Sequence, residues 1–200
     1  SVADPLNYYE VNVGGSISLL GAISRAKCYK IVFSSSATVN GEPQYLPYDE
    51  LHPTNPVNPY GWTKLMIEEI IRHWLMVNKK RKGIVLRYFN QVGPHQSGQI
   101  DEEPKGSLNN LMPHIALVAS GNKRFLKIFG NDYETIDGTG LRDYIHIVDL
   151  SKAHTKALRK QNSLDGIQVI NIGCGQGKTV LGIIKEFERS SGKSIHYEFY

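Results

Sequence analysis

Tyr60 and Lys64 stand four residues apart, a spacing that could support proton transfer. Residues at positions i and i+4 share one face of a helix, so the two side chains are neighbours if this segment is helical. A phenol has an ordinary pKa of about 10, and a nearby ammonium group favours the phenolate and lowers that pKa. The pair therefore predicts a tyrosine that can exchange protons near neutral pH.

The residues before this pair predict a helix that begins at Pro59. Asn58 is a favourable N-cap and proline suits the first helical position, which places Tyr60 in the first turn. The helix dipole favours negative charge there. Ser36, after an apolar segment, could add a hydroxyl to the group. Each part has a simpler interpretation: a surface tyrosine beside a solvated lysine, and a serine that makes a local turn hydrogen bond.

Hydrophobic periodicity predicts strands that alternate with helices. A parallel sheet in an α/β fold is the expected result. Asn90 follows one predicted strand as Ser36 follows another, so both should lie with Tyr60 at the carboxyl edge of the sheet, where active sites of open α/β sheets occur. The predicted strands are 29–35, 83–89, 125–129, 142–147, 169–172 and 194–199, and the predicted helices are 8–27, 59–78, one ending near Gly121, one from an Asp149 cap to about Arg159, and 179–190.

Composition narrows the classes of function. The 200 residues carry a net charge of +4, which is too mild and dispersed to indicate a nucleic-acid partner. No apolar run is long enough to cross a membrane. Cys28 and Cys174 form no C-x-x-C pair, which favours a reducing compartment, the cytoplasm. The first residues resemble neither a start site nor a signal peptide, so we expect an interior piece of a longer protein.

The glycine-rich segment 173–179 lies between a predicted strand and a predicted helix, where a phosphate-binding loop could occur. A Walker A loop would need glycine at position 172, which is Ile172. A dinucleotide fingerprint would need glycine at position 178, which is Lys178. We therefore expect a tight turn, and no other segment offers a dinucleotide fingerprint. His146 and His154 have no zinc-type spacing around them, so we expect no metal site.

Six segments, in order along the chain, resemble the UDP-glucose 4-epimerase family of extended short-chain dehydrogenases/reductases, which act on nucleotide sugars. The resemblance covers nearly the whole chain and implies a fragment that lacks the family's N-terminal glycine-rich region and its C-terminal end. The segments are 33–39, 58–61 with Lys64, 86–90, 109–113, 128–133 and 137–146.

The resemblance implies the following roles around NAD as cofactor. Tyr60 resembles the base that takes a proton from the sugar 4-hydroxyl, Lys64 resembles its partner on the nicotinamide ribose, and Ser36 resembles the serine that binds the 4-oxygen. All three would contact the cofactor, and Ser36 and Tyr60 would also contact the reacting sugar. Tyr88 and Phe89 lie where the family packs against nicotinamide. Asn12, on the first predicted helix, is a further candidate for cofactor contact.

For the UDP-sugar, the resemblance implies contacts beyond Ser36 and Tyr60. Arg142 would bind the diphosphate, a role that suits a guanidinium. Two alternatives stay open: Arg142 could instead pair with a nearby aspartate, and the apolar residues of the set could simply belong to a core. The further substrate-binding candidates are Asn90, Asn109, Asn110, Leu111, Lys127, Ile128 and Phe129.

The resulting expectation is a partial Rossmann-type doubly wound parallel sheet with a smaller α/β substrate-binding domain. Residues 1–90 would belong to the NAD-binding domain and 91–200 mostly to the UDP-sugar domain, with 142–172 crossing back to the Rossmann sheet. The implied activity is interconversion of UDP-glucose and UDP-galactose through a 4-keto intermediate. The implied assembly is a homodimer through the helices at 8–27 and 59–78.

Two alternatives to this function remain. One is a dehydratase or 5-epimerase of the same superfamily, although a dehydratase would need an acid/base pair beside Ser36, and no carboxylate follows it in 37–39. The other is a truncated chain that does not catalyse, which the missing dinucleotide loop favours. Whether N-acetylated sugars are accepted is not decided by these residues.

Overall fold

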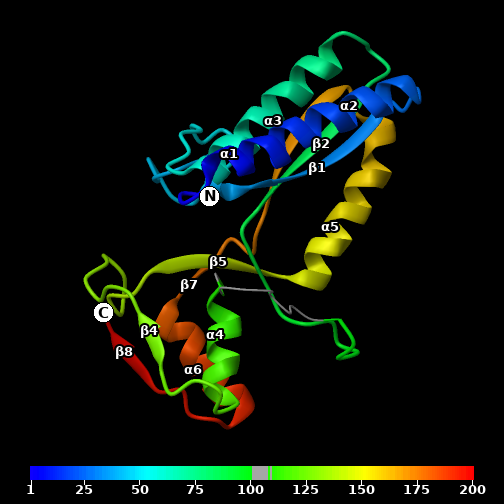
Figure 1. Cartoon of the computed structure of the whole chain (residues 1–200). Coiled ribbons are helices and arrows are strands. Elements are labelled where there is room, and N and C mark those ends of the chain that lie inside the picture. Colours follow the sequence, from blue (N-terminus) through cyan, green and yellow to red (C-terminus); the bar gives the residue numbers. More distant parts are fainter. Residues whose placement is uncertain (101–107, 109) are drawn as a thin grey trace. The chain divides into compact units, whose positions relative to one another are not determined.

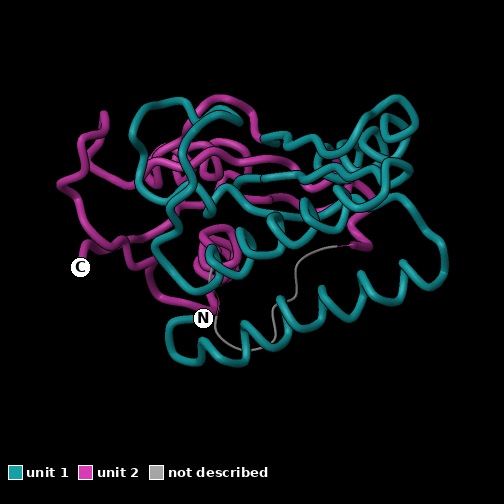
Figure 2. Tube along the Cα trace, turned by 90° about the horizontal axis from the view of Figure 1, so that it is seen from above, with its two compact units in different colours: residues 1–89, 149–172 teal, residues 90–148, 173–200 magenta. Residues whose placement is uncertain are grey.

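The computed structural model describes residues 1–100, 108 and 110–200, which form two compact units (Figure 2). Unit 1 consists of residues 1–89 and 149–172, and unit 2 consists of residues 90–148 and 173–200. The chain therefore leaves unit 1 after Phe89 and returns to it at Asp149, seven residues after the start of the predicted crossing segment.

Unit 1 is built on three parallel strands in the order β1-β2-β6 (Figure 1). Their bounds are β1 Lys30–Ser36, β2 Lys82–Tyr88 and β6 Gly166–Ile172. The predicted parallel sheet is thus confirmed. Because β1 and β2 pair in parallel, their carboxyl ends, Ser36 and Tyr88, lie opposite each other in register.

Helices cover both faces of this sheet. On one face lie α3 (Pro59–Met76) and the continuous run of α1 (Pro5–Tyr8), the π-helix η1 (Tyr9–Gly14) and α2 (Gly15–Arg25). Leu20 of α2 packs there with Ile67 and Ile71 of α3. On the other face, Ala157 of α5 (Ile147–Lys160) packs against β2. Two short 3-10 turns, η2 (Ala37–Val39) and η3 (Gln161–Ser163), complete the unit.

The start of α3 follows the sequence prediction. The Asn58 side chain accepts a hydrogen bond from the Gly61 N–H at 2.8 Å, and Pro59 is the first helical residue. Gly61 lets this turn approach η2 closely, because a Cβ atom there would lie 2.9 Å from the carbonyl oxygen of Thr38. The first turn of α3, which carries Tyr60, is thereby held against the end of β1.

The described residues of unit 2 form two small sheets and two helices. The first sheet has the order β3-β5-β7, with β3 (Asn90–Val92) parallel and β7 (Gly177–Thr179) antiparallel to β5 (Leu141–His146). The second pairs β4 (Leu126–Ile128) with β8 (Tyr197–Phe199) in parallel. A core of buried aliphatic residues from α4 (Leu111–Ala119), β4 and α6 (Val180–Ser191) joins them: Ile115, Val118, Leu126, Ile128, Ile184 and Ile195.

Three local predictions differ from the structure. Asp149 does not cap α5, which begins two residues earlier at Ile147 and holds Asp149 in its first turn. Ser36 is the last residue of β1 instead of the first after it. The strands β3 and β7, which both pair with β5, were not predicted.

Candidate active site

Ser36 and Tyr60 are brought together at the carboxyl end of β1. Ser36 is 8% exposed, and its oxygen accepts hydrogen bonds from the backbone N–H and the hydroxyl of Thr38, at 3.3 and 2.9 Å. The hydroxyl hydrogen of Ser36 remains available, and the hydrogen bond between Ser36 and Tyr60 lowers the pKa of the phenol. The two side chains are therefore close enough for Ser36 to affect the acidity of the phenol, and their roles in proton transfer stay a prediction.

Lys64 lies beside this pair on the same face of α3. Its Nζ atom donates to the carbonyl oxygen of Ser34 at 2.9 Å and lies 5.6 Å from the centre of the Tyr60 ring. Burial lowers the pKa of the lysine. An ammonium group has three donors, so this one keeps hydrogen-bonding capacity beyond the Ser34 contact.

The expected effect of Lys64 on the acidity of Tyr60 is wrong for this structure. Burial raises the pKa of Tyr60 above its ordinary value, Tyr88 and Tyr8 add to the increase, and the Ser36 hydrogen bond only partly opposes it. The reason is geometric: the ammonium group lies over the ring and bonds to a backbone carbonyl. The desolvation of the phenolate therefore outweighs the attraction of the cation.

The other predicted cofactor residues occupy two different places in unit 1. Tyr88 ends β2 in register with Ser36, and its ring centre lies 6.3 Å from that of His154. Phe89 follows it and donates its N–H to the carbonyl of Ile172. Asn12 lies on η1, where its amide donates to the Thr63 hydroxyl at 3.0 Å. That bond ties η1 to α3, and the predicted cofactor contact of Asn12 stays a prediction.

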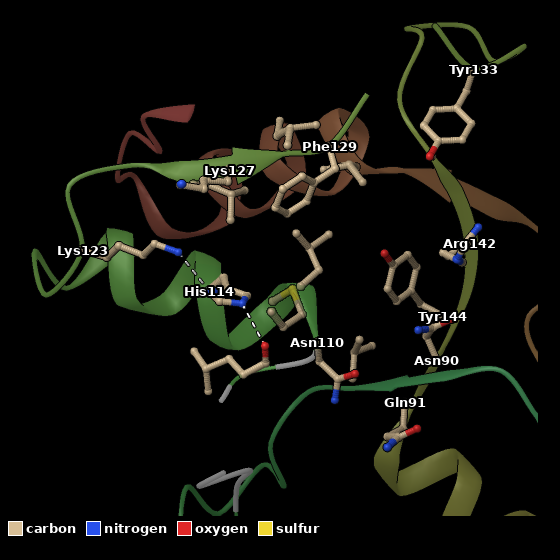
Figure 3. Close-up of a pocket in the computed structure, with 18 residues that line it drawn as sticks. Asn90, Gln91, Asn110, His114, Lys123, Lys127, Phe129, Tyr133, Arg142 and Tyr144 are labelled. Atoms are coloured by element: carbon tan, nitrogen blue, oxygen red, sulfur yellow. Dashed lines mark hydrogen bonds between the residues drawn. The ribbon is translucent and has the colours of Figure 1, made fainter. Parts of the chain in front are cut away.

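Unit 2 holds a pocket of about 660 Å³ (Figure 3). This volume falls in the usual range for small-molecule sites. Asn109 lies outside the described residues. Apart from Ser36 and Tyr60, which belong to unit 1, every other predicted substrate residue lines the pocket: Asn90, Asn110, Leu111, Lys127, Ile128, Phe129 and Arg142.

The pocket combines exposed apolar surface with cations. The side chain of Phe129 is 72% exposed, so the alternative that it belongs to the core does not hold. Arg142 and Tyr144 are two residues apart on β5 and both line the pocket, as expected for the period of a strand. Burial raises the pKa of Tyr144, and the charge of Arg142 opposes this increase.

Asp143, between these two residues on β5, contacts the glycine-rich segment 173–179 and shows why it is not free to bind a phosphate. Its carboxylate accepts hydrogen bonds from the backbone N–H groups of Cys174 and Gly175, at 2.9 and 2.8 Å. The backbone N–H groups that could donate to a bound phosphate therefore already donate to a carboxylate of the protein. Residues 173–176 form a turn, as predicted, but it leads from β6 into the short strand β7 and not directly into a helix.

Sequence reasoning missed His114 and Lys123, which also line the pocket. Lys123 Nζ and His114 Nδ1 are 3.2 Å apart, and His114 Nε2 and the Leu108 carbonyl oxygen are 3.3 Å apart. The lysine can only donate, so His114 Nδ1 accepts and Nε2 carries the proton. The three-residue spacing from Leu111 to His114 on α4 was the available signal, because it places both on one helix face.

Comparisons with known proteins agree with this arrangement. Residues 1–173 match the NAD dependent epimerase/dehydratase family, and the chain belongs to that family. It is 51% identical over 199 residues to UDP-glucose 4-epimerase of Homo sapiens, and 49% identical over 199 residues to that of Bacillus subtilis. These alignments cover 99% and 100% of the chain but 57% and 59% of the relatives, so the chain spans little more than half their length.

Solved structures give the same result. UDP-glucose 4-epimerase from Stenotrophomonas maltophila, with bound NAD and formylated UDP-arabinopyranose, matches with a TM-score of 0.96 at 42% identity. The Bifidobacterium longum enzyme, in complex with NAD+ and UDP, matches with a TM-score of 0.94 at 43% identity. Both comparisons cover 100% of this chain, and 61% and 60% of the solved chains. The resemblance inferred from the motifs is confirmed, as is the NAD dependence of the family.

Two further observations concern partners and metals. None of the helices in the described part of the chain has the length and apolar character needed to cross a bilayer. Within residues 1–100, 108 and 110–200, no three His, Cys, Asp or Glu side chains gather in a way that could hold a metal ion.

Proposed function

We propose that the complete protein carrying this chain interconverts UDP-glucose and UDP-galactose through a 4-keto intermediate. The observation that carries the proposal is the half-buried ammonium group of Lys64, which lies over the ring of Tyr60 at the carboxyl end of the strand that ends in Ser36. The names of the relatives support the choice of substrate.

The residues of unit 1 fit a nicotinamide cofactor. Lys64 has donors to offer to ribose hydroxyls, and Tyr88 ends the strand next to Ser36. NAD, when bound, would supply the hydride-transfer chemistry at carbon 4 of the sugar. Tyr60 takes the proton of the 4-hydroxyl and later gives it back, while Ser36 holds the oxygen through a hydrogen bond. No residue need form a covalent bond to the sugar.

The residues of unit 2 fit a uridine diphosphate group. Arg142 offers a guanidinium fork to the diphosphate, and its nearest acidic neighbour in sequence, Asp143, is engaged by backbone amides. Leu111 and Phe129 offer apolar surface to the base, whereas Ile128 lines the pocket but is buried in the core of unit 2. Asn90 and Asn110 contribute amides that can both donate and accept.

The test uses the complete protein and two substitutions. Tyr60→Phe should abolish most turnover of UDP-glucose and leave its binding, measured by calorimetry, nearly unchanged. Arg142→Met should weaken UDP binding, because a charge-assisted contact is lost. Wild-type turnover in Tyr60→Phe would refute the proposed base, and unchanged UDP affinity in Arg142→Met would refute the proposed diphosphate contact.

The same proposal includes a homodimer in the cytoplasm. Apolar side chains on η1, α2 and α3 are exposed in unit 1, with Val11 at 64%, Ile17 at 54% and Trp62 at 43%. A second copy packed on these helices would cover them. Cys28 and Cys174 are both free thiols, which suits a reducing compartment.

A further inference from the structure

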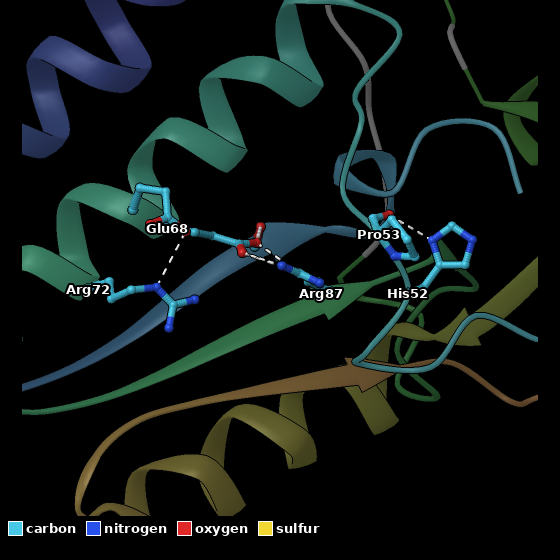
Figure 4. A network of polar contacts seen from close by, with 7 residues as sticks. His52, Pro53, Glu68, Arg72 and Arg87 are labelled. Atoms are coloured by element: carbon cyan, nitrogen blue, oxygen red, sulfur yellow. Dashed lines mark hydrogen bonds and ion pairs between the residues drawn. The ribbon is translucent and has the colours of Figure 1, made fainter. Parts of the chain in front are cut away.

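Three buried polar side chains connect the elements that carry the proposed proton-transfer residues. Ser35, Glu68 and Arg87 are 0%, 1% and 5% exposed. Arg87 Nη2 donates to Glu68 Oε2 at 2.6 Å, and Arg87 Nε lies 3.1 and 3.2 Å from the two carboxylate oxygens. The Ser35 hydroxyl donates to Glu68 Oε1. Figure 4 shows the Glu68 carboxylate extending from α3 to Arg87 on β2. We call these residues the Ser35–Glu68–Arg87 network.

Stability alone does not account for this network. Removing two charges from water costs several kcal/mol per ion, and replacing a buried ion pair by apolar residues of similar volume is often neutral or stabilising. A guanidinium that contacts both oxygens of a carboxylate fixes the relative position of the two elements that carry these groups. The network therefore fixes α3 relative to β1 and β2.

Its three members lie directly beside the proposed proton-transfer residues. Ser35 and Arg87 are register partners on β1 and β2, and the next register pair is Ser36 with Tyr88. Glu68 follows Lys64 by one turn of α3, as Lys64 follows Tyr60. Each member is thus one residue or one helical turn from a residue that we propose to act on the sugar or to contact the cofactor.

The Ser36–Tyr60 contact depends on how α3 lies along β1. A hydrogen bond between hydroxyl groups weakens when the oxygens move a few tenths of an ångström beyond about 3 Å. The Lys64 contact with Ser34 is a single bond to a backbone carbonyl, on a flexible side chain. The network supplies four contacts between α3 and the two strands, all shielded from water.

We propose that the Ser35–Glu68–Arg87 network positions Tyr60 for proton transfer, by holding α3 at the distance from β1 that lets the phenol meet the Ser36 hydroxyl. Its members are positioning residues and contact neither sugar nor cofactor. The proposal rests on the proposed function only in assigning the proton transfer to Tyr60.

The decisive experiment removes the network without changing net charge. In the complete protein, the triple variant Ser35→Ala, Glu68→Leu, Arg87→Met deletes one negative and one positive charge and leaves no polar atom of the network unpaired. We expect a melting temperature equal to or above wild type, turnover reduced by about 100-fold and an unchanged KM for UDP-glucose. We also expect a higher pKa of Tyr60, from 13C NMR of labelled tyrosine assigned with Tyr60→Phe, because the Ser36 hydrogen bond no longer opposes burial.

The control is Glu69→Gln on the same helix. It removes a carboxylate that pairs with Arg72 on the exposed surface, and it should change neither turnover nor the Tyr60 titration. If the triple variant fails to fold, the charge-neutral pair Glu68→Gln with Arg87→Gln replaces it, with the same expectations for turnover and titration.

Two outcomes overturn the proposal: wild-type turnover in the network variant, or a Tyr60 titration that does not move. An inactive wild-type protein would count against the proposed function instead. In that case the NMR titration still decides whether the network controls the surroundings of Tyr60.

Discussion

The acidity of Tyr60 depends on the competition between burial and nearby charge. In the structure burial prevails, and the pKa of the phenol lies above its ordinary value despite the Ser36 hydrogen bond. A tyrosine that accepts a proton near neutral pH needs additional positive charge near the ring. The nicotinamide ring of oxidised NAD carries such a charge.

We therefore predict that the pKa of Tyr60 in the complete protein decreases when NAD is added. Without NAD the phenol should titrate above its ordinary value, in the direction that burial dictates. The measurement is the 13C NMR shift of labelled tyrosines against pH, with Tyr60→Phe as the assignment control. A Tyr60 pKa that is already below its ordinary value before NAD is added would contradict the electrostatic argument.

At the scale of single residues, the sequence predicted the common helix face of Tyr60 and Lys64 but not the contacts that Lys64 makes. The spacing of Tyr60 and Lys64 predicted their common helix face, and Asn58 and Pro59 predicted where the helix begins. The spacing did not predict that the ammonium group would lie over the ring and bond to Ser34, because that depends on how α3 rests on β1.

At the scale of elements, the first turn of α3 contributes both to stability and to the proposed function. The Asn58 cap satisfies an N–H group of this turn, and Tyr60 lies within it. We predict that Asn58→Ala lowers the free energy of unfolding by about 1 kcal/mol. Turnover should fall as well, since the turn that carries Tyr60 loses its anchor.

Chemical denaturation and turnover assays of the complete protein check this prediction. The variant Asn58→Asp keeps a capping oxygen and should retain most of the stability. Equal losses in Asn58→Ala and Asn58→Asp would mean that the cap is not the cause.

The loop before β5 depends on a second local anchor. Asp137 accepts hydrogen bonds from the N–H and hydroxyl of Thr139, at 3.0 and 2.6 Å, and from the hydroxyl of Thr179 before α6. Burial raises the pKa of Asp137, but these hydrogen bonds outweigh it and hold the pKa below its ordinary value. The anchor therefore stabilises the charged form.

The sign of the resulting pH dependence follows from this lowered pKa. The stabilisation is fully present above the unfolded pKa of about 3.9 and is lost as the pH falls through the lower, folded value. We predict that Asp137→Asn lowers the melting temperature at neutral pH and reduces the loss of stability between about pH 5 and pH 2. Melting curves across this range, with exposed Asp132→Asn as the control, test it. An unchanged acid dependence in Asp137→Asn would contradict the assignment.

Element types were predictable where the pattern is long. The 18-residue helix α3 and the seven-residue strands β1 and β2 were all predicted, the helix as a long amphipathic segment and the strands as short apolar runs. The three-residue strands β3 and β7 were not, because their pairing with β5 is a tertiary effect. Asn90 was identified from its position after a predicted strand, whereas the role of Arg142 in the pocket was identified through the family resemblance.

At the scale of the whole molecule, exposed apolar helices predict self-association. Trp62 and Met66 are 43% and 41% exposed, and they lie one turn apart on α3. We predict that the complete protein is a dimer in light scattering and that Val11→Glu with Trp62→Glu shifts it toward monomer, because charges at an apolar contact oppose burial. A control pair on exposed, polar positions, Lys80→Glu with Lys156→Glu, should leave the mass unchanged. A wild-type monomer at micromolar concentration would end this hypothesis.

The chain passes from unit 1 to unit 2 and back, and this route has a consequence for synthesis on the ribosome. β2 can pair with β1 as soon as Tyr88 has emerged, but its other edge receives β6 only after residues 90–148 have been made. During that interval the nascent sheet has a temporary open edge, the type of surface that chaperones protect from aggregation. If synthesis stopped within residues 90–148, the released product would therefore keep this open edge and would be prone to aggregate.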